Sequence, residues 1–196
     1  TLSKYDVAII GGGILGTTIS YWISSLYDVN LCVIEKDHEV AMHASSRNTG
    51  VVHSPFYLNP KSKKILARSA LISYDMWKNL AKDSKIPWNN TGVLEIALNE
   101  EQHNSLEEYM DWGNENGIPE SDLELLSENQ VTKLEPNVKC HSAVRCTREV
   151  STDFGSFTRA IKTASAKNGT EFLMKKNVID IRNSKIIFND GSEMSS

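Results

Sequence analysis

The residues best suited to chemistry are a glycine-rich segment and an acid, Glu35, that follows it. The segment reads Gly11-Gly12-Gly13-Ile14-Leu15-Gly16. Gly11 permits a tight turn, Gly13 lets bare backbone approach a pyrophosphate, and Gly16 lets a helix pack close to a strand. The positive end of a helix beginning there suits a diphosphate. Glu35 follows at about the spacing at which an acid binds ribose hydroxyls, so the pattern predicts a dinucleotide site and disfavours NADP.

The patterns that flank these glycines predict the elements that would hold the site. Residues 5–10 form a nearly continuous apolar run, which is typical of a strand in a parallel sheet. A second apolar run, residues 29–34, ends just before Glu35. Between the two runs, apolar residues recur at helical spacing: Leu15, Ile19, Trp22 and Leu26. Strand, glycine turn, helix and strand make one βαβ unit, the context in which the glycine pattern is informative.

The remaining chain alternates predicted helices and strands. Residues 44–55 are polar and predict a loop, and a long helix is expected from Pro60. Three polar residues are predicted to cap further helices: Asn99, Ser127 and Asp153. The pairs Asn183-Ser184 and Asp190-Gly191 favour hairpin turns. Predicted strands lie at residues 91–98, 123–126, 143–147, 171–175, 178–182 and 186–188.

These elements together predict an α/β fold. We expect a Rossmann-like nucleotide-binding domain with a parallel sheet, a β-hairpin layer and an inserted, mainly helical lobe. We assign residues 1–58 and 150–196 to the nucleotide-binding core, and residues 59–149 to the inserted lobe on the substrate side.

Composition excludes several other classes of function. The 196 residues carry a formal net charge of −4 and no concentrated basic patch, which argues against a nucleic-acid partner. The five histidines and three cysteines show no ligand spacing, so we expect no metal site. No apolar run reaches the length of a membrane span. We expect a cytoplasmic protein, and leave open peripheral contact with the inner face of a membrane or with a second chain.

The segment after Glu35 and Lys36 favours a flavin cofactor over NAD. It reads Ser45-Ser46-Arg47-Asn48-Thr49-Gly50-Val51-Val52-His53. This segment resembles the FAD-dependent D-amino-acid oxidase superfamily, in which an SSxNxG stretch follows a Glu-Lys strand end. The similarity is greatest to the glycerol-3-phosphate dehydrogenase and L-2-hydroxyglutarate dehydrogenase branch. Weaker matches follow at Thr91-Gly92-Val93-Leu94 and Leu134-Glu135-Pro136.

The resemblance implies an FAD-dependent oxidoreductase, a flavoprotein that acts on a small anionic hydroxy compound. It implies cofactor contacts from Gly11, Gly13, Ile14, Leu15, Gly16, Glu35, Lys36, Ser45, Ser46, Asn48, Thr49, Gly50, Val51 and Val178. Val178 falls where members use a backbone strand position to hold adenine. His53 is the candidate for contact with the flavin or substrate, although a hydrogen-bonded loop histidine is an equally good interpretation.

Three alternatives remain open at this point. The chain could belong to an amino-acid or amine oxidase of the same superfamily, to a truncated nucleotide-binding module without catalysis, or to an NAD-dependent dehydrogenase. Members of the superfamily continue beyond the point matching Ser196 with a glycine-rich segment that closes over the flavin. We therefore expect the sequence to be the N-terminal part of a longer enzyme.

Overall fold

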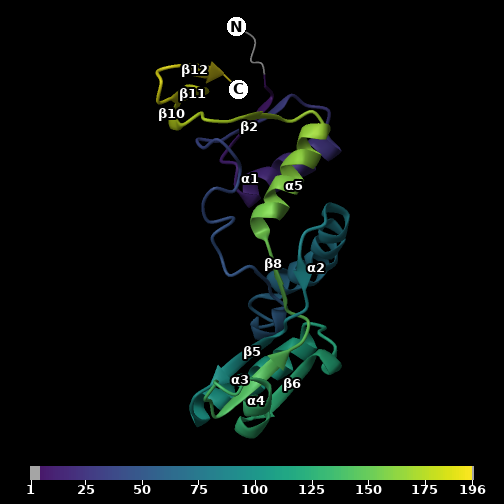
Figure 1. Ribbon diagram of the computed structural model, residues 1–196. Coiled ribbons are helices and arrows are strands. Elements are labelled where there is room, and N and C mark those ends of the chain that lie inside the picture. Colours follow the sequence, from purple (N-terminus) through teal and green to yellow (C-terminus); the bar gives the residue numbers. More distant parts are fainter. Residues whose placement is uncertain (1–4, 196) are drawn as a thin grey trace. The chain divides into compact units, whose positions relative to one another are not determined.

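The computed structural model describes residues 5–195, which divide into two compact units. The first unit combines the chain up to Gly50 with the chain from Asp153 onward, and the second spans Val51–Thr152. The expected boundaries at residues 58 and 150 thus move to 50 and 153. The reason is that two short strands next to these boundaries pair with each other inside the second unit. Figure 1 colours the elements of both units along the chain.

A three-stranded parallel sheet forms the centre of the first unit, in the order β1-β2-β9. Its strands are β1 (Val7–Ile10), β2 (Leu31–Ile34) and β9 (Glu171–Leu173). All four residues of β2 are buried, as expected of an apolar strand between two neighbours. The parallel sheet predicted from the apolar runs is therefore confirmed.

Two helices of the first unit pack against each other through small polar side chains. They are α1 (Ile14–Leu26) and α5 (Phe154–Lys167). The Ser20 and Ser165 hydroxyls lie 2.9 Å apart, and Ser165 donates to Thr170 Oγ1 at 2.8 Å. All three residues are buried. The apolar residues at helical spacing lie on the other side of α1, where Leu15 is 77 % exposed.

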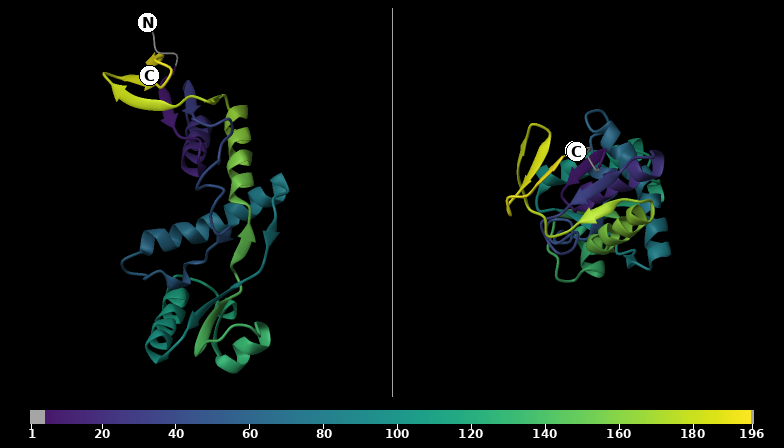
Figure 2. Two further views of the ribbon diagram at one scale, coloured as in Figure 1. Left: turned by 60° about the vertical axis from the view of Figure 1, so that its left-hand side comes forward. Right: turned by 90° about the horizontal axis from the view of Figure 1, so that it is seen from above.

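An antiparallel hairpin layer covers part of the parallel sheet. Its strands are β10 (Val178–Arg182), β11 (Lys185–Phe188) and β12 (Glu193–Ser195), drawn in yellow in both views of Figure 2. Ile186 and Phe188 pack with Cys32 and Ile34 of β2 in one buried cluster. Asn183 and Ser184 both have positive φ, as a type I′ turn requires, so the predicted hairpin is confirmed. The sequence did not predict β12.

The second unit contains a three-stranded sheet, in which the central strand is antiparallel to both of its neighbours, covered by helices. The strands, in the order β5-β7-β6, are β5 (Val93–Ala97), β7 (Ser142–Cys146) and β6 (Leu123–Ser127). The helices are α3 (Glu100–Glu115), α4 (Glu128–Leu134) and the short η2 (Glu120–Asp122). Asn99 accepts a hydrogen bond from Gln102 N, and Ser127 starts a capping box with Gln130, so both predicted caps are confirmed.

A second small sheet and a long helix complete this unit. The sheet order is β3-β8-β4, from β3 (Val51–Val52), β8 (Val150–Thr152) and β4 (Trp88–Asn89). The helices are η1 (Pro55–Tyr57) and α2 (Lys64–Ser84), which begins four residues after the predicted start at Pro60. Residues 51 and 52 were predicted as loop. They form a strand because Val51 pairs with Ser151 and Val52 with Val150, distant partners that local pattern does not contain. The lobe expected to be mainly helical thus carries two antiparallel sheets as well.

Candidate nucleotide-binding site

The glycine segment forms the turn between β1 and α1. Gly11 has φ of +106°, a conformation that L side chains rarely adopt, and its amide donates to Ile34 O at 2.8 Å. A Cβ at Gly16 would lie 1.9 Å from Gly11 O, so the helix approaches the turn as closely as glycine allows. The turn therefore has the geometry that the two outer glycines predict.

Glu35 lies at this turn and uses both of its carboxylate oxygens there. The residue is only 8 % exposed. Its Oε2 accepts from Gly12 N at 2.6 Å, and its Oε1 accepts from Asp37 N at 3.0 Å. The carboxylate at the end of β2 is thus directed at the glycine turn, where the sequence spacing places it. Buried and fixed by two backbone donors, it is preorganised to accept hydrogen bonds from vicinal hydroxyls at its rim.

The loop after β2 returns to the N-terminus of α1. Ser45 Oγ accepts a hydrogen bond from Ile14 N at 2.9 Å. Gly13, the N-cap, has no side chain to cap the helix, and the first turn of α1 has no acid. Ser45 therefore satisfies one helix amide from 31 residues away while its own hydrogen remains to be donated. This hydroxyl, the helix dipole and the bare backbone at Gly13 form a donor set that suits phosphate oxygens.

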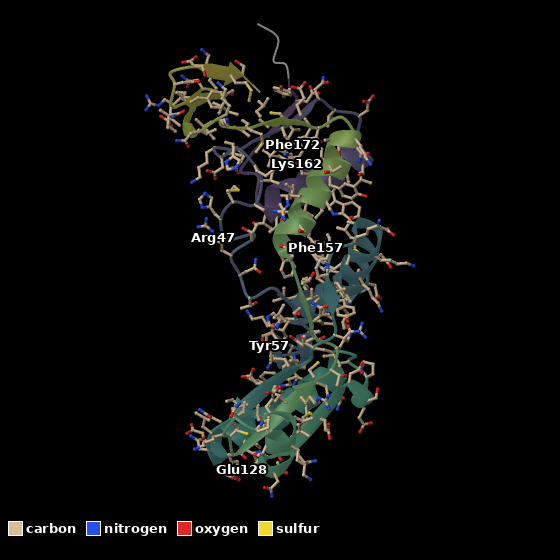
Figure 3. The ribbon with its side chains drawn as sticks, viewed as in Figure 1. Arg47, Tyr57, Glu128, Phe157, Lys162 and Phe172 are labelled. Atoms are coloured by element: carbon tan, nitrogen blue, oxygen red, sulfur yellow. The ribbon has the colours of Figure 1, made fainter. Side chains whose placement is uncertain are left out.

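The polar residues beyond Ser45 mostly fold the loop itself. Ser46 Oγ donates to Ala41 O at 2.5 Å. Asn48 Nδ2 donates to Ala44 O at 3.1 Å and to Ser45 O at 3.2 Å, while its Oδ1 accepts from Gly50 N at 2.9 Å. The Asn48 amide is thus committed to the shape of the loop. Figure 3 shows Arg47 projecting from this loop.

An ion pair attaches the same loop to α5. Lys162 Nζ lies 2.6 Å from Glu39 Oε1, and this hydrogen bond, more than any other contact, holds the pKa of Glu39 below its ordinary value. Lys162 also lies over the Phe172 ring at 5.8 Å, and both side chains are labelled in Figure 3. The loop that carries Ser45 is therefore fastened by a helix from the far end of the sequence.

The remaining expected contacts are spread more widely. Lys36 and Thr49 are exposed in the same loop, and Val178 is half-buried at the start of β10, packed against the cluster around Phe188. Val51 and His53 belong to the second unit. The structure thus gathers the glycine segment, Glu35 and Ser45 at one place.

His53 forms a pair that sequence reasoning missed. Its Nδ1 lies 2.8 Å from Glu149 Oε2, and Glu149 Oε1 accepts from Ser54 N at 2.6 Å. The Glu149 side chain is fully buried, whereas that of His53 is 47 % exposed. Burial raises the pKa of Glu149, while the Ser54 amide and His53 act in the opposite direction. No local pattern marks Glu149, because its partners lie 95 and 96 residues earlier in the chain.

One family of known proteins matches nearly the whole chain. The sequence profile described as FAD dependent oxidoreductase matches residues 6–193. This chain belongs to the FAD dependent oxidoreductase family. FAD is therefore the cofactor of its family, and the glycine turn fits the diphosphate of FAD: at Gly13 an added Cβ would come within 2.9 Å of Ser45 Oγ and fill the space above the helix amides.

Individual members of the FAD dependent oxidoreductase family share most of this chain. The mitochondrial L-2-hydroxyglutarate dehydrogenase of Caenorhabditis briggsae is 30 % identical over 169 residues, covering 86 % of this chain and 38 % of that protein. The structure of L-alpha-glycerophosphate oxidase from Mycoplasma pneumoniae with FAD bound has a TM-score of 0.79 and 26 % identity, covering 94 % of this chain and 49 % of that one. This FAD dependent oxidoreductase chain thus spans half or less of these two relatives.

Glycine oxidase from Geobacillus kaustophilus shows the same fold. Its TM-score is 0.83 at 22 % identity, and the match covers 99 % of this chain and 54 % of that chain. Proteins that act on hydroxy compounds and on amino compounds are therefore both structural neighbours. Among residues 5–195, no helix is long and apolar enough to span a membrane. The same residues contain no group of three or more side chains suited to holding a metal ion.

Proposed function

We propose that this FAD dependent oxidoreductase oxidises a small anionic hydroxy compound, either glycerol 3-phosphate or a 2-hydroxy acid. The observation that supports it most is the similarity of this chain to L-2-hydroxyglutarate dehydrogenase and L-alpha-glycerophosphate oxidase, together with the Glu35 carboxylate bonded to Gly12 N at the glycine turn. We place the active enzyme in the cytoplasm, with peripheral contact at the inner face of the membrane as an option. Cell fractionation tests that location.

We further propose roles for the residues of this chain. The amides of the glycine segment and the Ser45 hydroxyl bind the diphosphate, and Glu35 binds the adenosine ribose. The loop contributes backbone donors along the rest of the cofactor, because the Ser46 and Asn48 side chains are bonded within the loop, and the backbone at Val178 holds adenine. The proposed cofactor contacts are Gly11, Gly13, Ile14, Leu15, Gly16, Glu35, Lys36, Ser45, Ser46, Asn48, Thr49, Gly50, Val51 and Val178. Bound FAD supplies the two-electron acceptor, and the protein supplies orientation and electrostatics.

His53 is the residue that we propose for contact with the substrate. Its half-exposed imidazole is bonded to Glu149 through Nδ1, and within residues 5–195 the opposite ring nitrogen has no hydrogen bond and can contact a ligand. An imidazole can accept the proton of a hydroxyl group at neutral pH. This role suits a hydroxy substrate, whose oxidation to a carbonyl releases that proton.

The substrate proposal is tested on a longer protein that contains this chain, purified with FAD. Anaerobic addition of glycerol 3-phosphate or L-2-hydroxyglutarate should bleach the flavin absorbance. Glycine and L-proline serve as matched amino compounds. Bleaching by the amino compounds alone would support the alternative amino-acid oxidase, which the similarity of fold to glycine oxidase favours. FAD binding without bleaching by any of the four compounds would contradict both and support a nucleotide-binding module.

A further inference from the structure

The Glu149 carboxylate is a fully buried acidic group of the second unit. Glu149 lies in the connection from β7 to β8, and its side chain is fully buried. An ionised carboxylate is retained in such a place only when it is paired and hydrogen-bonded. Both of its oxygens are used, by Ser54 N at 2.6 Å and His53 Nδ1 at 2.8 Å. A buried acid with two assigned acceptors can determine the protonation of the ring that it contacts.

Among the charged groups that act most strongly on the pKa of Glu149, His53 lowers it and Glu95 raises it. Glu95 of β5 adds a like charge, and Tyr57 and Cys146 are neutral groups whose pKa values are raised by burial and by Glu149. The guanidinium of the adjacent Arg148 lies over the Tyr74 ring at 4.4 Å instead. The field at Glu149 therefore favours a hydrogen on the imidazole nitrogen that faces it.

The opposite ring nitrogen of His53 is available to a ligand. The side chain is 47 % exposed, and within residues 5–195 no hydrogen bond to Nε2 is present. When Nδ1 carries its hydrogen toward an ionised carboxylate, neutral imidazole has its lone pair on Nε2. Nε2 then accepts protons, whereas the other tautomer would only donate there.

We propose that Glu149 is a positioning residue that holds His53 in the Nδ1–H tautomer, so that Nε2 accepts the hydroxyl proton of the substrate. This inference rests on the proposed function. In the step, the substrate O–H bond breaks and its proton passes to Nε2, and bound FAD would supply the acceptor for the hydride released when the C–H bond breaks. The substrate is oxidised to a carbonyl, and the new imidazolium keeps its Nδ1–H on Glu149, which stabilises the charge.

Glutamine at position 149 separates this role from simple packing. Glutamine has the shape of glutamate but offers one oxygen acceptor and one NH₂ donor. The backbone amide of Ser54 can only donate, so the Gln oxygen must face Ser54 and its NH₂ must face His53. His53 Nδ1 then becomes an acceptor, and the neutral ring carries its hydrogen on Nε2.

The test is the tautomer of His53 in the ¹⁵N-labelled chain, read from long-range ¹H–¹⁵N correlation spectra near pH 8.5, about two units above the ordinary histidine pKa. We expect Nδ1–H in the wild type and Nε2–H in Glu149→Gln. The matched control is Glu95→Gln, which removes a nearby charge without touching either hydrogen bond and should keep Nδ1–H. Nε2–H in the wild type, as from a protonated Glu149 that donates, or an unchanged tautomer in Glu149→Gln, overturns the proposal. The wild-type spectrum is decisive even if the variant fails to fold.

This experiment separates the failure of the inference from that of the proposed function. The tautomer is read without FAD or substrate, so a negative result there rejects only the role of Glu149. In the longer oxidoreductase, Glu149→Gln should lower kcat by roughly 10²-fold or more, with a much smaller change in KM, because it removes the proton acceptor. A raised KM at unchanged kcat would instead show a binding role and overturn the proposal.

Discussion

At the scale of single residues, the candidate site depends on two glycines, because a Cβ atom at either position would meet a neighbouring atom. Gly16 has no room for a Cβ because Gly11 O would lie 1.9 Å away. Gly13 is different, since only the Ser45 hydroxyl would approach its Cβ. Gly16 is therefore required by the fold, whereas Gly13 keeps space open for a ligand.

This difference predicts the behaviour of Gly13→Val. The branched side chain would occupy the space over the helix amides and displace the Ser45 hydroxyl, so FAD affinity should fall by roughly 10-fold or more, about 1.4 kcal/mol. Titration of the chain with FAD, followed by flavin fluorescence, measures the change. Ile19→Ala, on the exposed face of the same helix, should bind FAD like the wild type. Equal affinity of Gly13→Val and the wild type would contradict the assignment of the diphosphate to this turn.

At the scale of elements, the loop between β2 and β3 is ordered by partners remote in sequence. Ser45 caps α1, and Glu39 is held by Lys162 of α5. Sequence patterns predicted residues 44–55 only as a polar loop, because the spacing of apolar residues says nothing about which side chains meet across the fold. The helices and strands that flank it were predictable, since their apolar spacing and their caps at Asn99, Ser127 and Asp153 are local.

The Glu39–Lys162 pair predicts a pH-dependent coupling. Because the pKa of Glu39 is lowered in the folded protein, its stabilisation is present above the ordinary glutamate pKa of about 4.3 and is lost as the pH falls through the lower folded value. A double-mutant cycle with Glu39→Gln and Lys162→Met, measured by urea unfolding, should give a coupling free energy of about 0.2–1 kcal/mol at pH 7. The value is small because both side chains are partly exposed. The coupling should shrink toward pH 3.

The control pair for this cycle is Lys185–Glu193, which joins two exposed side chains in the hairpin layer. Substituting it should alter stability without affecting FAD binding, whereas loss of the Glu39–Lys162 pair should also weaken FAD binding through the loop. A coupling energy that is the same at pH 7 and pH 3 would show that the ion pair does not fasten the loop.

At the scale of the whole molecule, the proposed diphosphate site and the proposed substrate residue belong to different units. The glycine turn, Glu35 and Ser45 lie in the first unit, and the His53–Glu149 pair lies in the second. Each unit has its own buried cluster, one around Phe188 and one around Phe56. A ligand that binds one unit should therefore leave a local signature there.

Hydrogen exchange in the presence of FAD measures that signature. With FAD at 100 times its Kd, amides of β1 and the first turn of α1 should exchange up to about 100-fold more slowly, because opening then requires release of the cofactor. The strands β5, β6 and β7 should be unchanged and act as the internal control. NAD at the same concentration should have no effect. Protection by NAD equal to that by FAD would favour a dinucleotide dehydrogenase instead.

The sequence by itself determined the βαβ unit, the glycine turn and the acid that follows it, because these depend on residues close together in the chain. Glycine needs no partner to permit a turn, and strand and helix spacing are properties of short segments. Only the tertiary structure decided that Val51 and Val52 form a strand and that Glu149 lies buried beside His53. Those outcomes depend on pairings between residues up to 100 positions apart, which the spacing of residues within a short segment cannot indicate.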